Sequence, residues 1–137
     1  AKELYQKILF LEFMIQLNRT AILNNINYLD SINENSKLLQ IINYINEHLT
    51  EDITIDKIAE HFYLSRYYLM HYFKAETGYT IGNYITEKRL LLAKDLVRKG
   101  CTVTEACYQC GFKNYSTFSR AFKKAFNTLP KNAVILD

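Results

Sequence analysis

One pattern of apolar and polar residues occurs twice in the 137-residue sequence, and this repeat restricts the possible folds more than any other feature. Four small or apolar positions return 48 residues later: Ile55, Ile58, Ala59 and Phe62 match Val103, Ala106, Cys107 and Cys110. After one extra residue in the second copy, four more positions match at an offset of 49: Ser65 with Asn114, Leu69 with Phe118, Phe73 with Phe122, and Lys74 with Lys123. In each copy this spacing predicts a short helix, a tight turn, a capping residue and a longer helix.

A short helix, a tight turn and a longer crossing helix make up a helix-turn-helix, so the chain is predicted to contain two of them in register. Capping residues and glycines mark where helices begin and end. The expected N-caps are Ser36, Thr54, Ser65, Thr102 and Asn114, with Glu105 completing a capping box with Thr102. Gly78 and Gly100 are expected to end the helices before them. We therefore expect helices over residues 36–48, 54–62, 66–76, 81–99, 102–110 and 114–126.

The predicted fold class is all-α: two helix-turn-helix subdomains joined by a long central helix, with an N-terminal helical pair. The sequence shows no alternating strand pattern, and its one Pro and four Gly are too few for the tight turns of a sandwich or barrel. We expect an N-terminal segment over residues 1–35, the double helix-turn-helix domain over 36–130 and a tail over 131–137. Within the domain, the first unit covers about 54–76, the central helix about 81–99 and the second unit about 103–126.

The N-terminal segment is unusually apolar. Residues 3–18 are apolar on nearly all sides of a helix, and Ile22, Ile26 and Leu29 continue at a spacing of three to four residues. Such a helix has to be covered. We expect the cover to be a second copy of the chain, in a homodimer through residues 4–32, or a domain outside this sequence. The alternative is that the helix folds back onto the rest of the chain. Residues 31–36, SINENS, are expected to be a polar linker.

The expected location is the cytoplasm, without membrane contact. No secretory signal is visible, and the apolar run is shorter than the about 20 residues that a bilayer requires. Three cysteines, an odd number, argue against a disulfide framework and agree with a reducing compartment.

Cys107 and Cys110 form a C-x-x-C pair, for which metal or redox chemistry has to be considered. A zinc site would need four ligands, whereas the three histidines are scattered along the chain. Cys107 occupies the position of Ala59 in the first copy, which favours a small buried residue. The sequence also contains no catalytic arrangement, phosphate loop or cofactor fingerprint. We expect no metal, no cofactor and no enzymatic activity.

Charge is unevenly distributed along the chain. Residues 1–52 carry four Lys/Arg against seven Asp/Glu, whereas residues 53–137 carry thirteen against seven. A basic half that contains helix-turn-helix units fits binding to double-stranded DNA, because the N-terminal part of the second helix enters a major groove. Two alternatives stay open: an unevenly charged but inert surface, and a helical protein-interaction module whose basic face binds an acidic partner.

Three segments carry a resemblance to a known family: LSRYYLMHYFKAETG, YITEKRLLLAKDLV and ACYQCGFKNYSTFSRAFKKAFNTLP. Together they resemble the AraC/XylS-type bacterial transcription regulators over roughly residues 38–130. The chain departs from the family pattern at Tyr63-Leu64, where Gly is common, at Ile81, where Pro often stands, and at its end, which lacks the usual aromatic-Arg pair. The resemblance implies two reading units on one face of DNA and a ligand-sensing domain before residue 1. If the regulator is an activator, a contact to RNA polymerase is also expected.

Helical geometry and the resemblance select nearly the same surface residues. Seven are expected to read bases: Tyr67, Met70 and His71 in the first unit, and Tyr115, Ser116, Ser119 and Arg120 in the second. Five basic residues are expected to hold phosphate: Arg66, Lys74, Lys113, Lys123 and Lys124. Arg120 is the strongest candidate, because arginine can bind guanine O6 and N7 with two hydrogen bonds. His71, at the matching place, offers fewer donors, so we expect the second unit to discriminate more sharply. For each residue the alternative is an exposed side chain without a contact.

Overall fold

In the computed structural model, the backbone is described for residues 2–23 and 33–135, and the side chains for residues 3–15 and 37–132. These residues form helices and no strand, which confirms the all-α prediction. The elements are α1 (Lys2–Leu23), α2 (Asn33–Glu47), α3 (Ile55–His61), α4 (Arg66–Thr77), α5 (Ile81–Arg98), α6 (Val103–Gln109), α7 (Tyr115–Phe126) and the 3₁₀ helix η2 (Pro130–Ile135).

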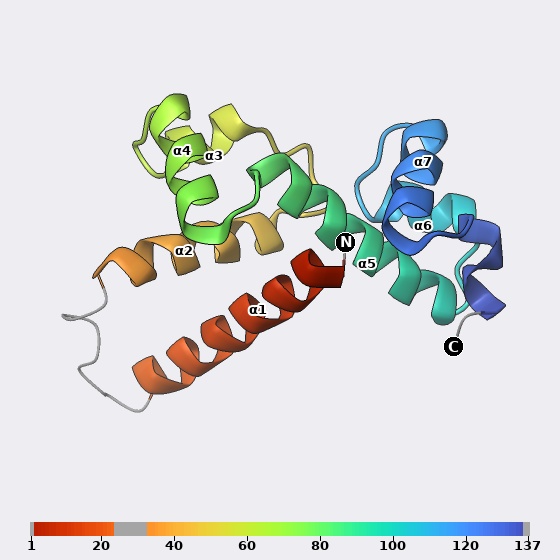
Figure 1. Ribbon diagram of the computed structural model, residues 1–137, viewed down its shortest axis with the longest axis horizontal. Coiled ribbons are helices and arrows are strands. Elements are labelled where there is room, and N and C mark those ends of the chain that lie inside the picture. The colour runs from red at the N-terminus through yellow and green to blue at the C-terminus, as the bar shows by residue number, and fades with distance from the viewer. Residues whose placement is uncertain (1, 24–32, 136–137) are drawn as a thin grey trace.

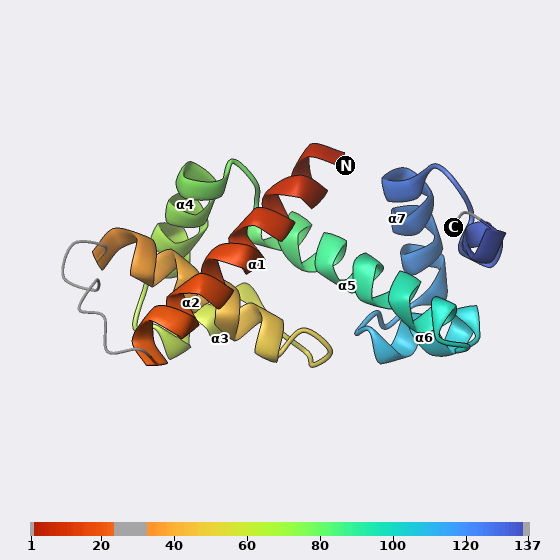
Figure 2. The same cartoon turned by 90° about the horizontal axis from the view of Figure 1, so that it is seen from below.

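The two predicted units lie at opposite ends of α5 (Figures 1 and 2). The first unit is α3 and α4, and the second is α6 and α7. In Figure 1 both units lie on the same side of α5, and the N-terminal ends of α4 and α7 are both at the top of the view. The N-terminal ends of α4 and α7 therefore lie on one side of the central helix α5.

Local capping explains why the helices begin where the sequence predicts. The side chains of Thr54, Ser65 and Asn114 each accept a hydrogen bond from the backbone N–H three residues later. Thr102 does the same, and Glu105 completes the capping box by accepting from the Thr102 backbone N–H. These four caps satisfy backbone donors that the first turn would otherwise leave unpaired.

The start of α2 differs from the prediction. Ser36 was expected to cap this helix, and residues 31–36 were expected to be a linker, whereas α2 already begins at Asn33. This segment contains neither Gly nor Pro, so its polar composition does not break a helix. The tail also contains structure: Pro130–Ile135 forms η2 against α5 and α7.

Two apolar clusters stabilise the fold, and they divide along α5. The first joins α1 and α2 to the first unit and to the beginning of α5; its fully buried members include Ile8, Ile41, Ile42, Ile45, Ile58, Leu69 and Phe73. The second joins the other half of α5 to the second unit and includes Leu90, Ala93, Ala106, Cys107, Cys110, Phe118 and Phe122. Each unit therefore has its own core, as the matched apolar positions of the repeat predict.

Over residues 3–15, where its side chains are described, helix α1 is covered on one face. Leu4, Ile8 and Ile15 are buried in the first cluster, where α1 packs against α2 and α5. Glu12 also forms an ion pair with Lys88 of α5. The fold-back alternative thus accounts for one face of this segment. The other face leaves five large side chains exposed: Tyr5, Leu9, Phe10, Phe13 and Met14.

The second stretch of the predicted helical pair is only partly placed. Ile22 belongs to α1, whereas Ile26 and Leu29 lie outside the described residues. Among the described residues, no helix is long and apolar enough to cross a membrane.

Candidate nucleic-acid interface

On α4, buried residues anchor one face and leave the predicted base-reading residues on the other. Leu69 and Phe73 are fully buried, so the helix is fixed in rotation against the core. Tyr67 is 72% exposed and Met70 is 41% exposed, and His71 is exposed beside them. All three lie in the N-terminal half of the helix, which is the part of a recognition helix that reaches base edges.

Tyr67 and His71 form a pair rather than two independent side chains. Their rings stack with centroids 3.9 Å apart, and His71 Nδ1 lies 2.9 Å from the Tyr67 carbonyl oxygen. Because a carbonyl oxygen only accepts, Nδ1 carries the proton and donates this bond. Because Nδ1 is occupied by this bond, Nε2 is the His71 ring nitrogen that is left to contact a base edge.

On α7 the same arrangement presents different chemistry. Phe118 and Phe122 are buried, and Tyr115, Ser116 and Arg120 are exposed. Ser119 is half-buried, which limits its reach. Among the described residues, Arg120 has no hydrogen bond or ion pair, so its guanidinium is available to a ligand. A guanidinium with free donors can bind guanine O6 and N7 together.

The five predicted phosphate ligands divide into two groups. Lys74, Lys123 and Lys124 are exposed on the recognition helices. Arg66 is engaged with Asp56, with Nη1 3.2 Å from Oδ2. Lys113 is engaged with Asp52, with Nζ 2.9 Å from Oδ1, and this contact lowers the pKa of the Asp52 carboxyl. A phosphate would have to compete with these carboxylates for Arg66 and Lys113.

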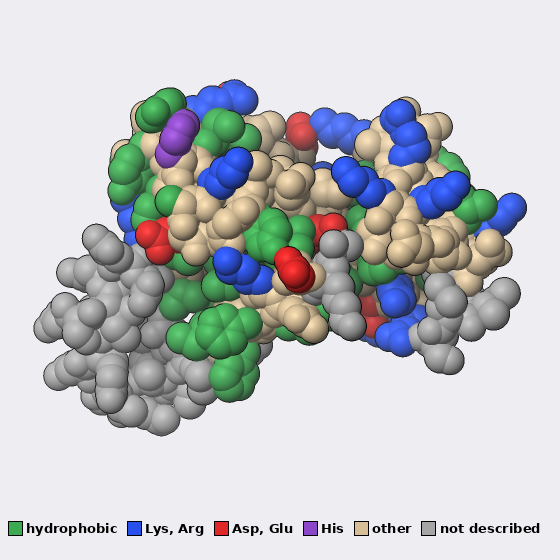
Figure 3. Space-filling model, viewed as in Figure 1, with side chains coloured by type: hydrophobic (Ala, Val, Ile, Leu, Met, Phe, Trp, Pro, Cys, Tyr) green, Lys and Arg blue, Asp and Glu red, His purple; other side chains and the backbone are tan. Residues whose placement is uncertain are grey.

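Figure 3 shows how the two units differ on one face. Lys and Arg side chains are spread over the second unit, whereas hydrophobic side chains lie among the basic ones over the first. A basic surface attracts the phosphate backbone regardless of sequence, so the second unit offers the more electropositive tip on this face.

The C-x-x-C pair lies in the apolar core of the second unit. Cys107 and Cys110 are fully buried, and the Cys110 thiol donates to the Cys107 carbonyl oxygen at 3.2 Å. Burial raises the pKa of the Cys107 thiol and raises that of Cys110 to about 11. Burial thus disfavours the thiolate form of both side chains, which is the reactive form of cysteine. The described residues contain no group of three or more His, Cys, Asp or Glu that could hold a metal ion.

Comparison with known proteins agrees with this geometry. A family profile described as a helix-turn-helix domain matches residues 58–133. An AraC-type DNA-binding domain protein from Chromobacterium violaceum superposes with a TM-score of 0.68 at 25% identity, over 74% of this chain and 91% of that chain. The chain belongs to the AraC-type helix-turn-helix family.

Two further members of this family illustrate its range. The C-terminal domain of the two-component response regulator yesN from Fusobacterium nucleatum is 32% identical, with a TM-score of 0.68, over 73% of this chain and 98% of that chain. The HTH-type transcriptional activator RhaS of Salmonella schwarzengrund is 32% identical over 128 residues. That match covers 93% of this chain but 44% of RhaS, so the chain spans less than half the length of the curated relatives it matches.

One group that the sequence did not reveal connects the central helix α5 to the loop before the first AraC-type unit. Arg89, in the middle of α5, donates hydrogen bonds to backbone oxygens of the loop between α2 and α3. Its partners are carbonyls about forty residues away, and a carbonyl leaves no signature in a sequence. The signal that the sequence offered was the place of Arg89 on α5, on a face of the helix that also carries buried positions.

Proposed function

We propose that this chain is the DNA-reading part of a transcription regulator. In this proposal the N-terminal turns of α4 and α7 enter successive major grooves, roughly 34 Å or one helical turn apart, on one face of the duplex. The observation that supports it best is the duplicated unit itself, with the N-terminal ends of α4 and α7 on the same side of α5 (Figure 1). If the two tips do not match the groove spacing of straight DNA, the DNA bends to meet them.

The proposed roles of the surface residues follow from their exposure. Tyr67, Met70 and His71 contact base edges from the first unit, and Tyr115, Ser116, Ser119 and Arg120 contact them from the second. Lys74, Lys123 and Lys124 hold phosphates directly, and Arg66 and Lys113 join them when a phosphate displaces the neighbouring carboxylate. Phosphate contacts set affinity and its dependence on salt, whereas base contacts set the sequence preference.

The test begins with selection of bound duplexes from a random pool, followed by binding to the selected duplex and to a scrambled competitor over a range of salt concentrations. We expect a preference for the selected duplex and an affinity that falls as salt rises. Equal affinity for both duplexes at every salt concentration would favour the alternative, a helical module that binds an acidic protein.

The partners beyond DNA are also proposed. The exposed face of α1, with Phe10 60% and Phe13 57% exposed, supports a homodimer through residues 4–32. Sedimentation of the wild-type chain and of Phe13→Asp tests this, and a monomeric wild type would instead point to another domain as the cover. A cytoplasmic location fits a regulator of genes. A contact to RNA polymerase is proposed because the similar protein RhaS is named an activator.

A further inference from the structure

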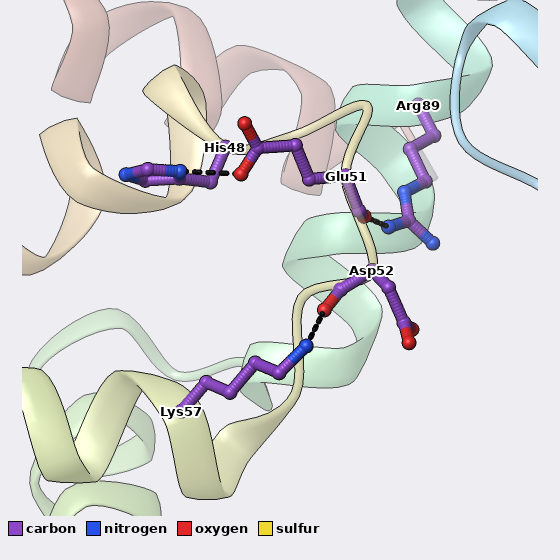
Figure 4. A network of polar contacts seen from close by, with 5 residues as sticks. All are labelled: His48, Glu51, Asp52, Lys57 and Arg89. Atoms are coloured by element: carbon purple, nitrogen blue, oxygen red, sulfur yellow. Dashed lines mark hydrogen bonds and ion pairs between the residues drawn. The ribbon is translucent and has the colours of Figure 1, made fainter.

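The loop between α2 and α3, residues 48–54, lies where the two units approach each other. Arg89 of α5 is half-buried beneath it. Its Nε donates to the Leu49 carbonyl oxygen at 2.9 Å. Its Nη2 donates to the Glu51 carbonyl oxygen at 2.9 Å, as Figure 4 shows. One side chain of the central helix thus holds the loop of the first half of the molecule at two points.

The second unit contacts the same place through its turn. A Cβ added at Gly111 would lie 2.7 Å from Arg89 Nε and 2.9 Å from the Leu49 carbonyl oxygen. Two residues further on, Lys113 forms its ion pair with Asp52. The turn of the second helix-turn-helix is therefore seated against the loop of the first half, with Gly111 permitting the close approach.

Two further contacts hold the loop in its conformation. Lys57 donates from Nζ to the Asp52 carbonyl oxygen at 2.8 Å, which ties the loop to α3. Within the loop, His48 Nδ1 lies 2.6 Å from Glu51 Oε2, directly after the end of α2 (Figure 4). The Asp52 carbonyl is thus held from α3, and the Leu49 and Glu51 carbonyls are held from α5. We therefore expect a displacement of Arg89 or of the Gly111 turn to change how the second unit lies against the first.

We propose that Arg89, the loop residues 49–52 and the Gly111 turn form an inter-unit brace that sets the spacing and rotation between α4 and α7. The second unit packs on α5, and this contact runs along the axis of that helix. The brace adds a second contact away from that axis, which restricts rotation of the second unit about α5. The proposal rests on the proposed function in one respect. On DNA, the brace makes Arg89 a positioning residue that determines which distance is accepted between the two half-sites, meaning the base pairs read by α4 and those read by α7 of the same chain.

Gly111→Ala tests the brace, and Gly100→Ala is its matched control. Both glycines have positive φ, +110° and +105°, so both substitutions carry the same kind of backbone strain. Of these two glycines, Gly111 has neighbours within 4 Å of the added Cβ, and Gly100 has none. Gly111→Ala should therefore displace the second unit, whereas Gly100→Ala should leave its position unchanged.

The displacement is measured as a distance distribution between spin labels at Glu60→Cys and Tyr108→Cys, which are exposed, matched positions in α3 and α6. Cys101 is replaced by Ser, and the buried Cys107 and Cys110 are protected. We expect a shifted or broadened distribution in Gly111→Ala and the wild-type distribution in Gly100→Ala. An unchanged distribution in a folded Gly111→Ala protein would overturn the proposal.

A second pair of variants decides the question if Gly111→Ala unfolds the second unit. Arg89→Met removes both hydrogen bonds and keeps the apolar stem, while Lys99→Met removes the same charge from the exposed end of α5, where Lys99 pairs with Asp95. Arg89→Met should broaden the distribution, and Lys99→Met should not. Equal distributions in the two variants would contradict the proposed brace.

The DNA measurement uses the selected duplex with one or two base pairs inserted between the half-sites. Each insertion moves the half-sites by about 3.4 Å and rotates them by about 35°. The wild type should lose about tenfold or more in affinity per insertion, and Arg89→Met should lose several-fold less; identical spacing profiles would overturn the positioning role. If the wild type selects no duplex, the proposed function fails, and the label distances still decide the brace.

Discussion

The two helix-turn-helix units share one backbone design and differ in what their recognition helices offer to a ligand. On α4 the exposed tip is aromatic and apolar, with Tyr67 stacked on His71. On α7 it is polar and basic, with Ser116 and Arg120 exposed. Caps, buried positions and the exposed pair Lys74 and Lys123 match between the units, whereas the predicted base-reading positions do not. The comparison indicates that the repeat fixes the fold and leaves each tip free to acquire its own preference.

The units also differ in their support. The first shares its core with α1 and α2. The second relies on the C-terminal half of α5 and on η2. Since α5 is the element that contributes buried residues to both clusters, we expect the second unit to open without unfolding the first.

Removing a core ring from either unit tests this independence and should have the largest effect. Phe122 is 1% exposed and packs against Phe118 and Phe126. Phe122→Ala should lower the free energy of unfolding of the second unit by about 3–5 kcal/mol, through lost burial and a cavity. Amide hydrogen exchange should then show lost protection in α6 and α7 and retained protection in α2 and α4.

Phe73→Ala is the reciprocal variant, because Phe73 is fully buried in the first cluster and contacts Tyr84 of α5. It should lower protection in α3 and α4 first. Uniform loss of protection along the chain in both variants would show that the clusters unfold as one, and the comparison of their supports would then fail.

The tips are compared by Arg120→Ala and His71→Ala. A bidentate arginine contact contributes about 1–3 kcal/mol of discrimination between bases, so Arg120→Ala should relax the preference at one position of the selected duplex by about that amount. His71→Ala should have a smaller effect, since its Nδ1 is already bonded to the Tyr67 carbonyl. Binding to a set of single-base variants measures both. A uniform loss of affinity across all duplexes in Arg120→Ala would contradict its role in reading bases.

Features decided by residues close in sequence were predicted best. The N-caps at Thr54, Ser65 and Asn114 were correct because a cap involves only the next three residues. The matched apolar positions Leu69, Phe73, Phe118 and Phe122 are buried as expected, because helical spacing defines a face. The predicted start of α2 was wrong, because the polar composition of residues 31–36 was taken to indicate a linker, whereas the helix begins at Asn33.

Features decided by distant residues were missed. Arg66 and Lys113 were predicted as phosphate ligands from their positions, but their ion pairs with Asp56 and Asp52 depend on how α3 and the loop before it are placed. The contacts of Arg89 with the loop carbonyls are of the same kind. Side-chain spacing within one helix carries no information about a partner in another element.

The turns provide a further comparison. Tyr63, 97% exposed, occupies the first turn with φ of 56°, and Gly111 occupies the second with φ of 110°. A left-handed conformation costs a residue with a Cβ about 1–2 kcal/mol. Substitution by glycine removes this strain, but glycine loses more conformational entropy on folding, which offsets part of the gain in stability. Tyr63→Gly should therefore stabilise the first unit by about 0.5–1 kcal/mol. Urea unfolding measures this, with Tyr63→Ala as the control that keeps the strain. Equal stability of the two variants would contradict the expected strain.

The smallest expected effect concerns the carboxylate that engages Arg66 in the first unit. The Arg66–Asp56 pair is solvent-exposed, with side chains 60% and 69% exposed, so it contributes about 0–1 kcal/mol. Asp56→Asn frees the guanidinium for a phosphate and should raise DNA affinity up to about fivefold. Asp95→Asn is the control, because it removes the same charge from an exposed pair with Lys99 on α5. The two variants change net charge equally, so a difference between them isolates the role of Arg66.

The dependence of affinity on salt distinguishes a new phosphate contact from a general change in charge. Each phosphate neutralised on duplex DNA adds about 0.9 to the slope of log affinity against log salt. If Arg66 binds a phosphate only after Asp56 is neutralised, the slope of Asp56→Asn should be steeper than that of Asp95→Asn by about this amount. Equal slopes with unequal affinities would mean that Arg66 already binds phosphate in the wild type. In that case Arg66 contributes its positive charge to DNA binding despite its ion pair with Asp56. The two units would then differ in the residues that read bases and not in how they bind phosphate.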